Sequence, residues 1–310
     1  MDNKLKILMA TYNGEKFIRE QLNSILNQSY NDFELIIRDD GSKDRTVSII
    51  QEYIEKDNRV NLLVGKNLGQ TQNFNALLRE VQDAEYVMFA DQDDVWMEDK
   101  VELSLQKIKN IEEEKGKEYP IMVYSNLRYV DEKLNDIPNK LREINEESIN
   151  TILGYNFVWG CTMLINNSLL RLSYPIGKSA QNHDYWIALT CALNGVMYNL
   201  GRETLLYRQH SNNVTGGINN YSLISKLKRL SKLFNSYNDQ LNQNLEFCAK
   251  YKHLNNRLLL SYESAIKSNA LKRLIIFNKL NIRRSTLKET ALYYFYIFML
   301  LKKGDLKYEK

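Results

Sequence analysis

The sequence predicts an α/β protein in which helices flank a mostly parallel sheet, followed by a helical C-terminal extension. Short apolar runs of strand length alternate with segments whose apolar residues recur every three or four positions, as in helices that cover a parallel sheet. Polar clusters follow the first, second and fourth of these runs. Because parallel sheets bind ligands at the carboxyl ends of their strands, these clusters are the first candidates for a functional site.

The first part of the chain has the most regular pattern. Its first helical segment places Phe17, Ile18, Leu22 and Ile25 on one face, which is the arrangement of a helix that covers a sheet. The predicted strands are residues 5–10, 33–37, 60–64 and 86–90, and the predicted helices are residues 15–28, 46–54, 70–81 and 101–114.

The middle of the chain is less regular. The polar residues 131–150 predict a mobile loop. Gly160 lies inside an apolar run, which indicates the close approach of a ligand or of another backbone segment. The predicted strands here are residues 121–124, 159–165 and 204–207, and the predicted helix is residues 185–193.

The chain changes character near residue 220. Residues 221–310 carry 18 Lys and Arg against six Asp and Glu, whereas residues 1–220 carry 24 against 32. We therefore expect a catalytic domain over residues 1–220 and a basic helical region over residues 221–310. The scattered cysteines, Cys161, Cys191 and Cys248, form neither a zinc pattern nor a disulfide framework. With no signal peptide, this indicates a cytoplasmic protein.

The basic region reads as amphipathic helices. Apolar residues such as Leu227, Leu230, Leu271 and Ile275 alternate with Lys and Arg, and the aromatic run 293–298 favours an interface. One interpretation is a helical surface on the inner face of the plasma membrane, where it contacts anionic lipid. The other is helices that pack on the catalytic domain or on a second copy in a homodimer. We do not expect nucleic acid as a partner, because the first 220 residues are acidic and contain no nucleic-acid motif.

The acidic run that follows residues 86–90 contains Asp91, Asp93 and Asp94. If the backbone stays extended, Asp91 and Asp93 point to the same side and present two hard oxygen ligands, which suit Mg²⁺ or Mn²⁺. The alternative is a solvated turn that caps the helix after it. We expect Asp94 either to cap that helix or to face a bound substrate.

Two nucleotide-binding patterns are absent. The turn after the first strand holds one glycine, Gly14, where a dinucleotide-binding turn needs Gly-x-Gly-x-x-Gly, and no P-loop lysine pattern occurs. A nucleotide diphosphate bound here would need its charge met in another way, and a cation held by Asp91 and Asp93 would meet it.

These motifs together resemble the inverting glycosyltransferases of family 2, which have the GT-A fold of nucleotide-diphospho-sugar transferases. The resemblance covers about residues 4–217, and its later motifs are most similar to the rhamnosyltransferase branch of cell-wall and capsular polysaccharide synthesis. The motifs are Ala10-Thr11-Tyr12-Asn13-Gly14, Arg38-Asp39-Asp40-Gly41-Ser42-Lys43-Asp44, Asp91-Gln92-Asp93-Asp94-Val95-Trp96, His183-Asp184 and Tyr207-Arg208-Gln209-His210-Ser211-Asn212-Asn213-Val214-Thr215-Gly216.

The resemblance implies a role for each matching residue. Asp184 would be the general base, although a carboxylate at a helix start is also a common cap. The resemblance implies a nucleotide site at Thr11, Tyr12, Asp39, Asp40 and Asp91, in which Asp40 would accept the pyrimidine N3–H. It also implies a metal site at Asp93, Asp91 and His210, in which Asp93 would be the more direct ligand. We further expect a substrate pocket at Trp96, Gly160, Cys161 and His183, in which His183 orients its neighbour and has no chemical role.

The resemblance also implies the reaction and its partners. The donor would be dTDP-L-rhamnose, the cofactor Mn²⁺ or Mg²⁺, and the acceptor a hydroxyl of a lipid-linked glycan. Two alternatives stay open: a UDP-hexose or UDP-N-acetylhexosamine donor on the same fold, and a non-catalytic scaffold that binds nucleotide or glycan. Because the sequence contains Asp184 as well as the Asp91 and Asp93 motif, it favours an enzyme over the scaffold.

Overall fold

The structure is a computed structural model that describes residues 4–138, 147–210, 223–301 and 306. The chain divides into two compact units. The first, the sheet unit, contains the described residues of 4–138, 158–176 and 190–210. The second, the helical unit, contains those of 147–157, 177–189 and 223–306. The helical unit therefore includes two short segments that precede residue 220.

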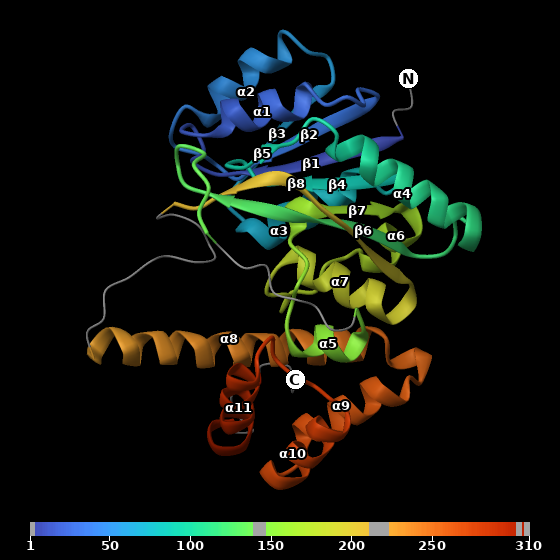
Figure 1. Ribbon diagram of the computed structural model, residues 1–310, viewed down its shortest axis with the longest axis vertical. Coiled ribbons are helices and arrows are strands. Elements are labelled where there is room, and N and C mark those ends of the chain that lie inside the picture. The colour runs from blue at the N-terminus through green and yellow to red at the C-terminus, as the bar shows by residue number, and fades with distance from the viewer. Residues whose placement is uncertain (1–3, 139–146, 211–222, 302–305, 307–310) are drawn as a thin grey trace. The chain divides into compact units, whose positions relative to one another are not determined.

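The sheet unit is built on an eight-stranded mixed sheet of order β3-β2-β1-β4-β7-β6-β8-β5 (Figure 1). The first four strands in this order run parallel, β7 pairs antiparallel with both its neighbours, and β6 pairs parallel with β8. The predicted α/β fold is confirmed. The strands are β1 Leu5–Thr11, β2 Phe33–Asp39, β3 Val60–Val64, β4 Tyr86–Ala90, β5 Val95–Trp96, β6 Ile121–Val130, β7 Met163–Asn166 and β8 Val196–Arg208.

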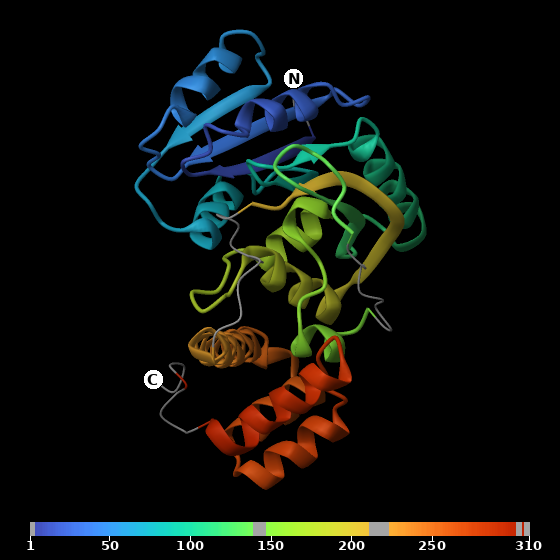
Figure 2. The same ribbon diagram turned by 60° about the vertical axis from the view of Figure 1, so that its left-hand side comes forward.

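Alternation along the strands sends successive side chains to opposite faces of the sheet. On one face, Ile7 and Met88 join a buried core with α1, α2 and α4. On the other face, Phe89 packs edge-on against Phe74 of α3, with 5.8 Å between ring centroids. Figure 2 shows α3 on the opposite side of the sheet from α1 and α2. The helices of this half of the chain are α1 Ile18–Leu26, α2 Thr46–Ile54, α3 Gln70–Glu80 and α4 Lys100–Lys115.

The middle of the chain departs from the prediction in several places. Strands β6 and β8 are longer than predicted, because they pair with each other along their lengths through two irregularities. Strand β7 starts late, because residues Gly160–Thr162 form a turn of 3₁₀-helix. The predicted loop 131–150 is wrong at its end, where α5 begins with a cap from Ser148; residues 139–146 lie outside the described part. The helices here are α5 Ile149–Gly154, α6 Asn167–Ser173 and α7 His183–Asn194.

The C-terminal region is helical, as predicted. Its apolar interior is aromatic: Tyr237 packs on Tyr293, which packs on Phe277, with centroid distances of 5.0 and 6.2 Å. None of the helices within the described ranges is both long enough and apolar enough to cross a membrane. The elements are α8 Leu223–Lys250, a 3₁₀-helix Lys252–Leu254, α9 Arg257–Lys267, α10 Ala270–Lys279, α11 Leu287–Phe295 and a π-helix Tyr296–Leu300.

Candidate active site

The polar clusters lie at one edge of the sheet unit. Strand register pairs Thr11 with Asp39 and Met9 with Ala90, so the residues that follow β1, β2 and β4 emerge side by side. The predicted parallel arrangement of these strands is confirmed.

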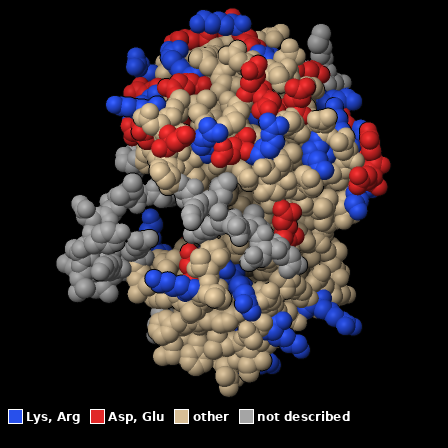
Figure 3. Space-filling view, in the orientation of Figure 1, with Lys and Arg blue, Asp and Glu red and all other residues tan. Residues whose placement is uncertain are grey.

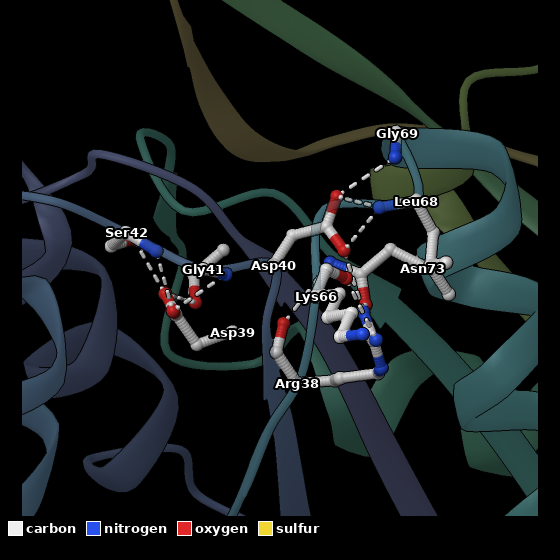
Figure 4. Close-up of polar contacts among 10 residues, drawn as sticks. Arg38, Asp39, Asp40, Gly41, Ser42, Lys66, Leu68, Gly69 and Asn73 are labelled. Carbon is white, nitrogen blue, oxygen red and sulfur yellow. Dashed lines mark hydrogen bonds and ion pairs between the residues drawn. The ribbon is translucent and has the colours of Figure 1, made fainter.

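Asp39 folds the turn that follows β2. Its buried carboxylate accepts hydrogen bonds from the backbone N–H groups of Gly41 and Ser42 at 3.0 and 2.8 Å, and from the Ser42 hydroxyl at 2.6 Å (Figure 4). It also accepts the Thr11 hydroxyl at 2.9 Å. Asp39 and Thr11 therefore join the ends of β1 and β2.

Asp40 is held on the other side of the same strand end. Its carboxylate accepts the Arg38 guanidinium at 2.7 Å and the backbone N–H groups of Leu68 and Gly69 at 2.8 Å, and Arg38 also donates to Asn73 at 2.8 Å (Figure 4). Asp40 is 3% exposed. It therefore fixes the loop that leads into α3, and a base N3–H bound here would have to share these oxygens with that loop.

The acidic turn after β4 does not continue the strand. The strand ends at Ala90, so the alternation that was expected to align Asp91 with Asp93 does not apply. Instead, Asp93 Oδ2 lies 2.8 Å from His210 Nε2, whereas Asp91 lies with Asp94 and Cys161, all three ligand atoms being within 4.8 Å of one another. The expected cap at Asp94 is wrong: Asp94 is buried and its Oδ1 accepts the Arg208 N–H at 3.2 Å.

Arg208 organises this turn from the end of β8. Its side chain is 1% exposed and donates to the Asp93 carbonyl at 2.8 Å, to the Glu132 carbonyl at 2.5 Å and to the Glu20 carboxylate at 2.6 Å. Its guanidinium also lies 4.6 Å from the ring centroid of Phe17. One side chain thus fixes the backbone of the acidic turn that carries Asp93.

The Asp93 and His210 pair fits a divalent cation. Two ligands bound at about 2.1 Å and at right angles lie about 3 Å apart, close to the 2.8 Å between these atoms. A carboxylate oxygen suits Mn²⁺ and Mg²⁺, and the imidazole nitrogen of histidine is the commonest protein ligand of metal ions. Cys161 is a poor ligand here, because burial raises the pKa of its thiol well above the ordinary value and Asp94 and Asp91 add to the shift.

Beneath the turn lies a buried polar network. Burial raises the pKa of Asp94 well above its ordinary value, and the charges of Asp93 and Asp91 add to the shift. Lys100 is fully buried, donates to the Thr204 hydroxyl at 3.2 Å, and lies 4.8 Å from the Trp96 ring centroid. Trp96 and Cys161 are part of the hydrophobic core, with 4% and 2% exposure. Trp96 and Cys161, which were expected in the substrate pocket, therefore pack in the core next to the acidic turn.

Burial lowers the pKa of Lys100 from 10.5 to about 8, although Cys161 and Asp94 oppose the shift. Between those pH values the unfolded chain holds a proton that the folded protein has released, so the free energy of unfolding rises with pH because of this group. In wild type this increase in the free energy of unfolding amounts to at most about 3 kcal/mol, and we expect it to be absent in Lys100→Met. Urea unfolding at pH 7.5 to 10 measures this for wild type, for Lys100→Met and for the control Lys109→Met, which changes an exposed lysine. If the free energy of unfolding changes with pH equally in wild type and Lys100→Met, the expectation is contradicted.

Asp184 lies in the helical unit, in the first turn of α7. Its Oδ1 accepts the Asn156 amide at 3.1 Å and its neighbour's backbone N–H at 2.5 Å. The same helix is held by Tyr185, whose hydroxyl donates to the Ile152 carbonyl at 2.7 Å and accepts from Gln240 at 2.7 Å. Burial lowers the pKa of His183 to about 3, so this histidine is neutral and contributes no positive charge.

Three contributions went unnoticed in the sequence. The Gln92 side chain bonds reciprocally to the backbone N–H and C=O of Tyr12, at 2.9 and 3.0 Å. A Cβ on Gly14 would lie 2.3 Å from the Gln92 amide oxygen, so this contact requires glycine there. Arg208 was also missed: it lies at the end of β8, and its partners in the acidic turn are more than a hundred positions earlier in the sequence.

Comparison with known proteins gives the family of the chain. The model of "Glycosyl transferase family 2" matches residues 6–160, half of the chain. The dTDP-rhamnosyl transferase RfbG of Shigella flexneri is 29% identical over 273 residues, 82% of this chain and 89% of that protein. An uncharacterized glycosyltransferase of Haemophilus influenzae is 30% identical over 60% of this chain and 71% of that protein.

Solved structures show the same fold at low identity. S. aureus TarS 1-349 superposes with a TM-score of 0.54 at 18% identity, over 94% of this chain and 89% of that one. The mannosyltransferase PcManGT from Pyrobaculum calidifontis, in complex with GDP-Man and Mn²⁺, gives 0.55 at 15% identity, over 97% and 81%. The fold is therefore that of GT-A glycosyltransferases, and the chain belongs to glycosyltransferase family 2.

Proposed function

We propose that this glycosyltransferase moves L-rhamnose from dTDP-L-rhamnose to a hydroxyl of a lipid-linked glycan. The observation that carries the proposal is the Asp93 and His210 pair, 2.8 Å apart at the edge of the sheet where parallel folds bind their ligands. The similarity to a dTDP-rhamnosyl transferase over most of both chains supports the choice of sugar.

The nucleotide site is proposed at the ends of β1 and β2. Tyr12 is 45% exposed at this edge and offers a ring surface for a base, while Asp39 and Asp40 fix the loops around it. The Thr11 hydroxyl holds Asp39, so in this arrangement it orders the loop behind the base.

Asp93 and His210 would hold a Mn²⁺ or Mg²⁺ ion, with Asp91 as a further carboxylate nearby. Such an ion stabilises the charge that develops on the diphosphate leaving group. Arg208 keeps the Asp93 backbone in place for this purpose. Its bond to Glu20 at 2.6 Å leaves the guanidinium engaged within the protein rather than facing the phosphates.

Asp184 is proposed as the general base that takes the proton of the acceptor hydroxyl as it attacks the anomeric carbon. Attack opposite the leaving group inverts that centre and needs no covalent intermediate. The Asn156 amide, which donates to Asp184 Oδ1 at 3.1 Å, orients the carboxylate. A positioned carboxylate contributes typically ~10²–10⁴-fold to such a reaction.

Hydrolysis of a panel of nucleotide sugars by the purified protein tests the donor. We expect dTDP-L-rhamnose to be cleaved at least tenfold faster than UDP-glucose, UDP-galactose and UDP-N-acetylglucosamine. Preference for a UDP-sugar would show that the alternative donor is the correct one, without changing the assignment to family 2. Binding of nucleotides without cleavage or transfer of any sugar would favour the scaffold.

Asp93→Ala is expected to weaken donor binding in the presence of Mn²⁺ by at least tenfold, because it removes one of the two paired ligands. Binding without metal is expected to stay unchanged. Titration calorimetry with dTDP, with and without Mn²⁺, measures both. Asp83→Ala, which changes a carboxylate outside this site, is the control, and equal Mn²⁺-dependent binding by Asp93→Ala and wild type would contradict the assignment.

We further propose that the protein works on the inner face of the plasma membrane, where a lipid-linked acceptor is found. The net +12 charge of residues 221–310, behind an acidic catalytic half, supports an anionic membrane surface as a partner. A homodimer through the same region is the competing arrangement. Sedimentation of the full-length protein with anionic vesicles at low salt tests the membrane association.

A further inference from the structure

We propose that the outer faces of α10, α11 and the π-helix form one membrane-binding surface. This surface is defined by six exposed apolar residues, and the proposal rests on the membrane association proposed above. The residues, with their exposed fractions, are Leu271 64%, Ile275 59%, Leu287 78%, Phe295 50%, Phe298 41% and Met299 59%.

The apolar residues form ridges rather than isolated positions. On α10, Leu271 and Ile275 are four residues apart, and therefore lie on one face of the helix. On α11, Leu287 and Phe295 are eight residues apart, a spacing that falls within one helical face, and the π-helix continues with Phe298 and Met299. Such a concentration of large apolar side chains on an exterior is characteristic of an interaction site.

The helical unit does not use these side chains for its own interior. The opposite faces of the same helices are buried: Phe277 on α10, and Tyr293 and Ile297 on α11 and the π-helix. Phe277 packs on Tyr262 with 5.1 Å between ring centroids, and Tyr293 on Tyr237 with 5.0 Å. The aromatic run 293–298 is therefore divided between an interior face and the exposed surface.

A buried arginine joins α10 to the π-helix. Arg273 of α10 donates to the Ile297 carbonyl at 2.6 Å, and to the carbonyls of Ile266 and Ser268 at 3.1 and 3.0 Å. Ile297 immediately precedes Phe298 and Met299. Because this guanidinium fixes the π-helix against α10, the Leu271 ridge and the Phe298 end are parts of one rigid body.

The charge around the surface selects the occupant. Four exposed cations flank the ridges: Lys272, Lys279, Arg283 and Lys288. Between residues 267 and 299 the sole acidic residue is Glu289, which accepts the Ser285 hydroxyl. On the face shown in Figure 3, the helical unit likewise presents mainly blue side chains among tan ones.

This combination fits an anionic lipid surface. Lysines beside apolar side chains place their ammonium groups among lipid phosphates while the apolar groups enter the acyl boundary. A second copy of the chain would bring the same cations against each other at a two-fold contact, where like charges repel. The lipid headgroup supplies the negative charge that the described part of the surface lacks.

Two variants of the full-length protein test the surface by co-sedimentation with vesicles of phosphatidylcholine and phosphatidylglycerol. Lys272→Gln with Lys279→Gln and Lys288→Gln should lower vesicle binding about a hundredfold at low salt, since each lysine contributes about fivefold. Leu271→Ser with Ile275→Ser and Phe295→Ser should lower it at least tenfold, and this loss should persist at high salt.

Matched controls lie in the sheet unit. Val64→Ser removes an apolar residue of the same 64% exposure, and Lys56→Gln removes an exposed lysine; both should bind vesicles as wild type does. All variants should keep the wild-type melting temperature and rate of donor hydrolysis, which separates loss of membrane binding from loss of the enzyme. If both triple variants sediment with vesicles like wild type, the surface is misassigned.

Two further outcomes would overturn the proposal. If wild-type protein does not bind vesicles at low salt, both the membrane association and this surface are wrong. Donor hydrolysis would still test the proposed glycosyl transfer independently. A wild-type dimer in light scattering that the serine variant converts to a monomer would assign the surface to a second copy of the chain.

Discussion

Asp184→Asn is expected to lower the rate of glycosyl transfer by ~10²–10⁴-fold while leaving donor affinity within about twofold. The amide cannot accept the acceptor's proton, but it keeps an oxygen for the bonds from Asn156 and the Tyr185 backbone. Single-turnover transfer and calorimetric binding of dTDP, on the same preparation, measure the two quantities.

Asp239→Asn is the matched control, since this aspartate is exposed on α8 of the same unit. Its transfer rate should equal that of wild type. A melting temperature of Asp184→Asn close to that of wild type shows that the fold is intact. Unchanged turnover in Asp184→Asn would show that another group is the base and that Asp184 serves as an ordinary first-turn carboxylate of α7.

Arg208→Met is expected to lower the free energy of unfolding by about 2–5 kcal/mol, because it leaves two carbonyls, of Asp93 and Glu132, without their buried donor. It should also weaken Mn²⁺-dependent donor binding by at least tenfold, since the turn that carries Asp93 is no longer fixed. Arg208→Lys should recover only part of the stability and part of the Mn²⁺-dependent binding, because an ammonium group cannot donate in several directions as the guanidinium does.

Arg202→Met on the same strand is the control. Arg202 forms an exposed ion pair with Asp99 at 3.4 Å, which contributes at most about 1 kcal/mol. Urea unfolding and dTDP calorimetry with Mn²⁺ measure the series. If Arg208→Lys regains stability but not Mn²⁺-dependent binding, the positioning role stands. Full Mn²⁺-dependent binding in Arg208→Met would contradict it.

The sequence predicts the ends of the strands better than the contacts made there. Alternating strands and helices place Thr11, Asp39 and Asp91 at one edge, because parallel strands end together. The pairing of Asp93 with His210 was not predictable from spacing, since 117 positions separate them and β8 reaches this edge only through its long pairing with β6. The resemblance to glycosyltransferase family 2 indicated that both residues are metal ligands, but it did not indicate that they contact each other.

The acidic turn shows why local patterns fail at a site. An extended run would have aligned Asp91 with Asp93, but the strand ends at Ala90 and the turn buries Asp94 instead. Burial of that carboxylate is compatible with folding because Arg208 donates its backbone N–H and Lys100 lies in the network below. These partners come from β8 and α4, so no window of sequence around Asp94 contains them all.

The central claim is that the chain transfers a sugar with inversion. Product analysis tests it most directly: purified protein, Mn²⁺, dTDP-L-rhamnose and a short polyprenyl-diphosphate-linked glycan are incubated, and the product is examined by mass spectrometry and NMR. We predict an acceptor heavier by one deoxyhexosyl residue whose anomeric configuration is opposite to that of the donor. A retained configuration, or an unchanged acceptor with every nucleotide sugar of the panel, would contradict the account.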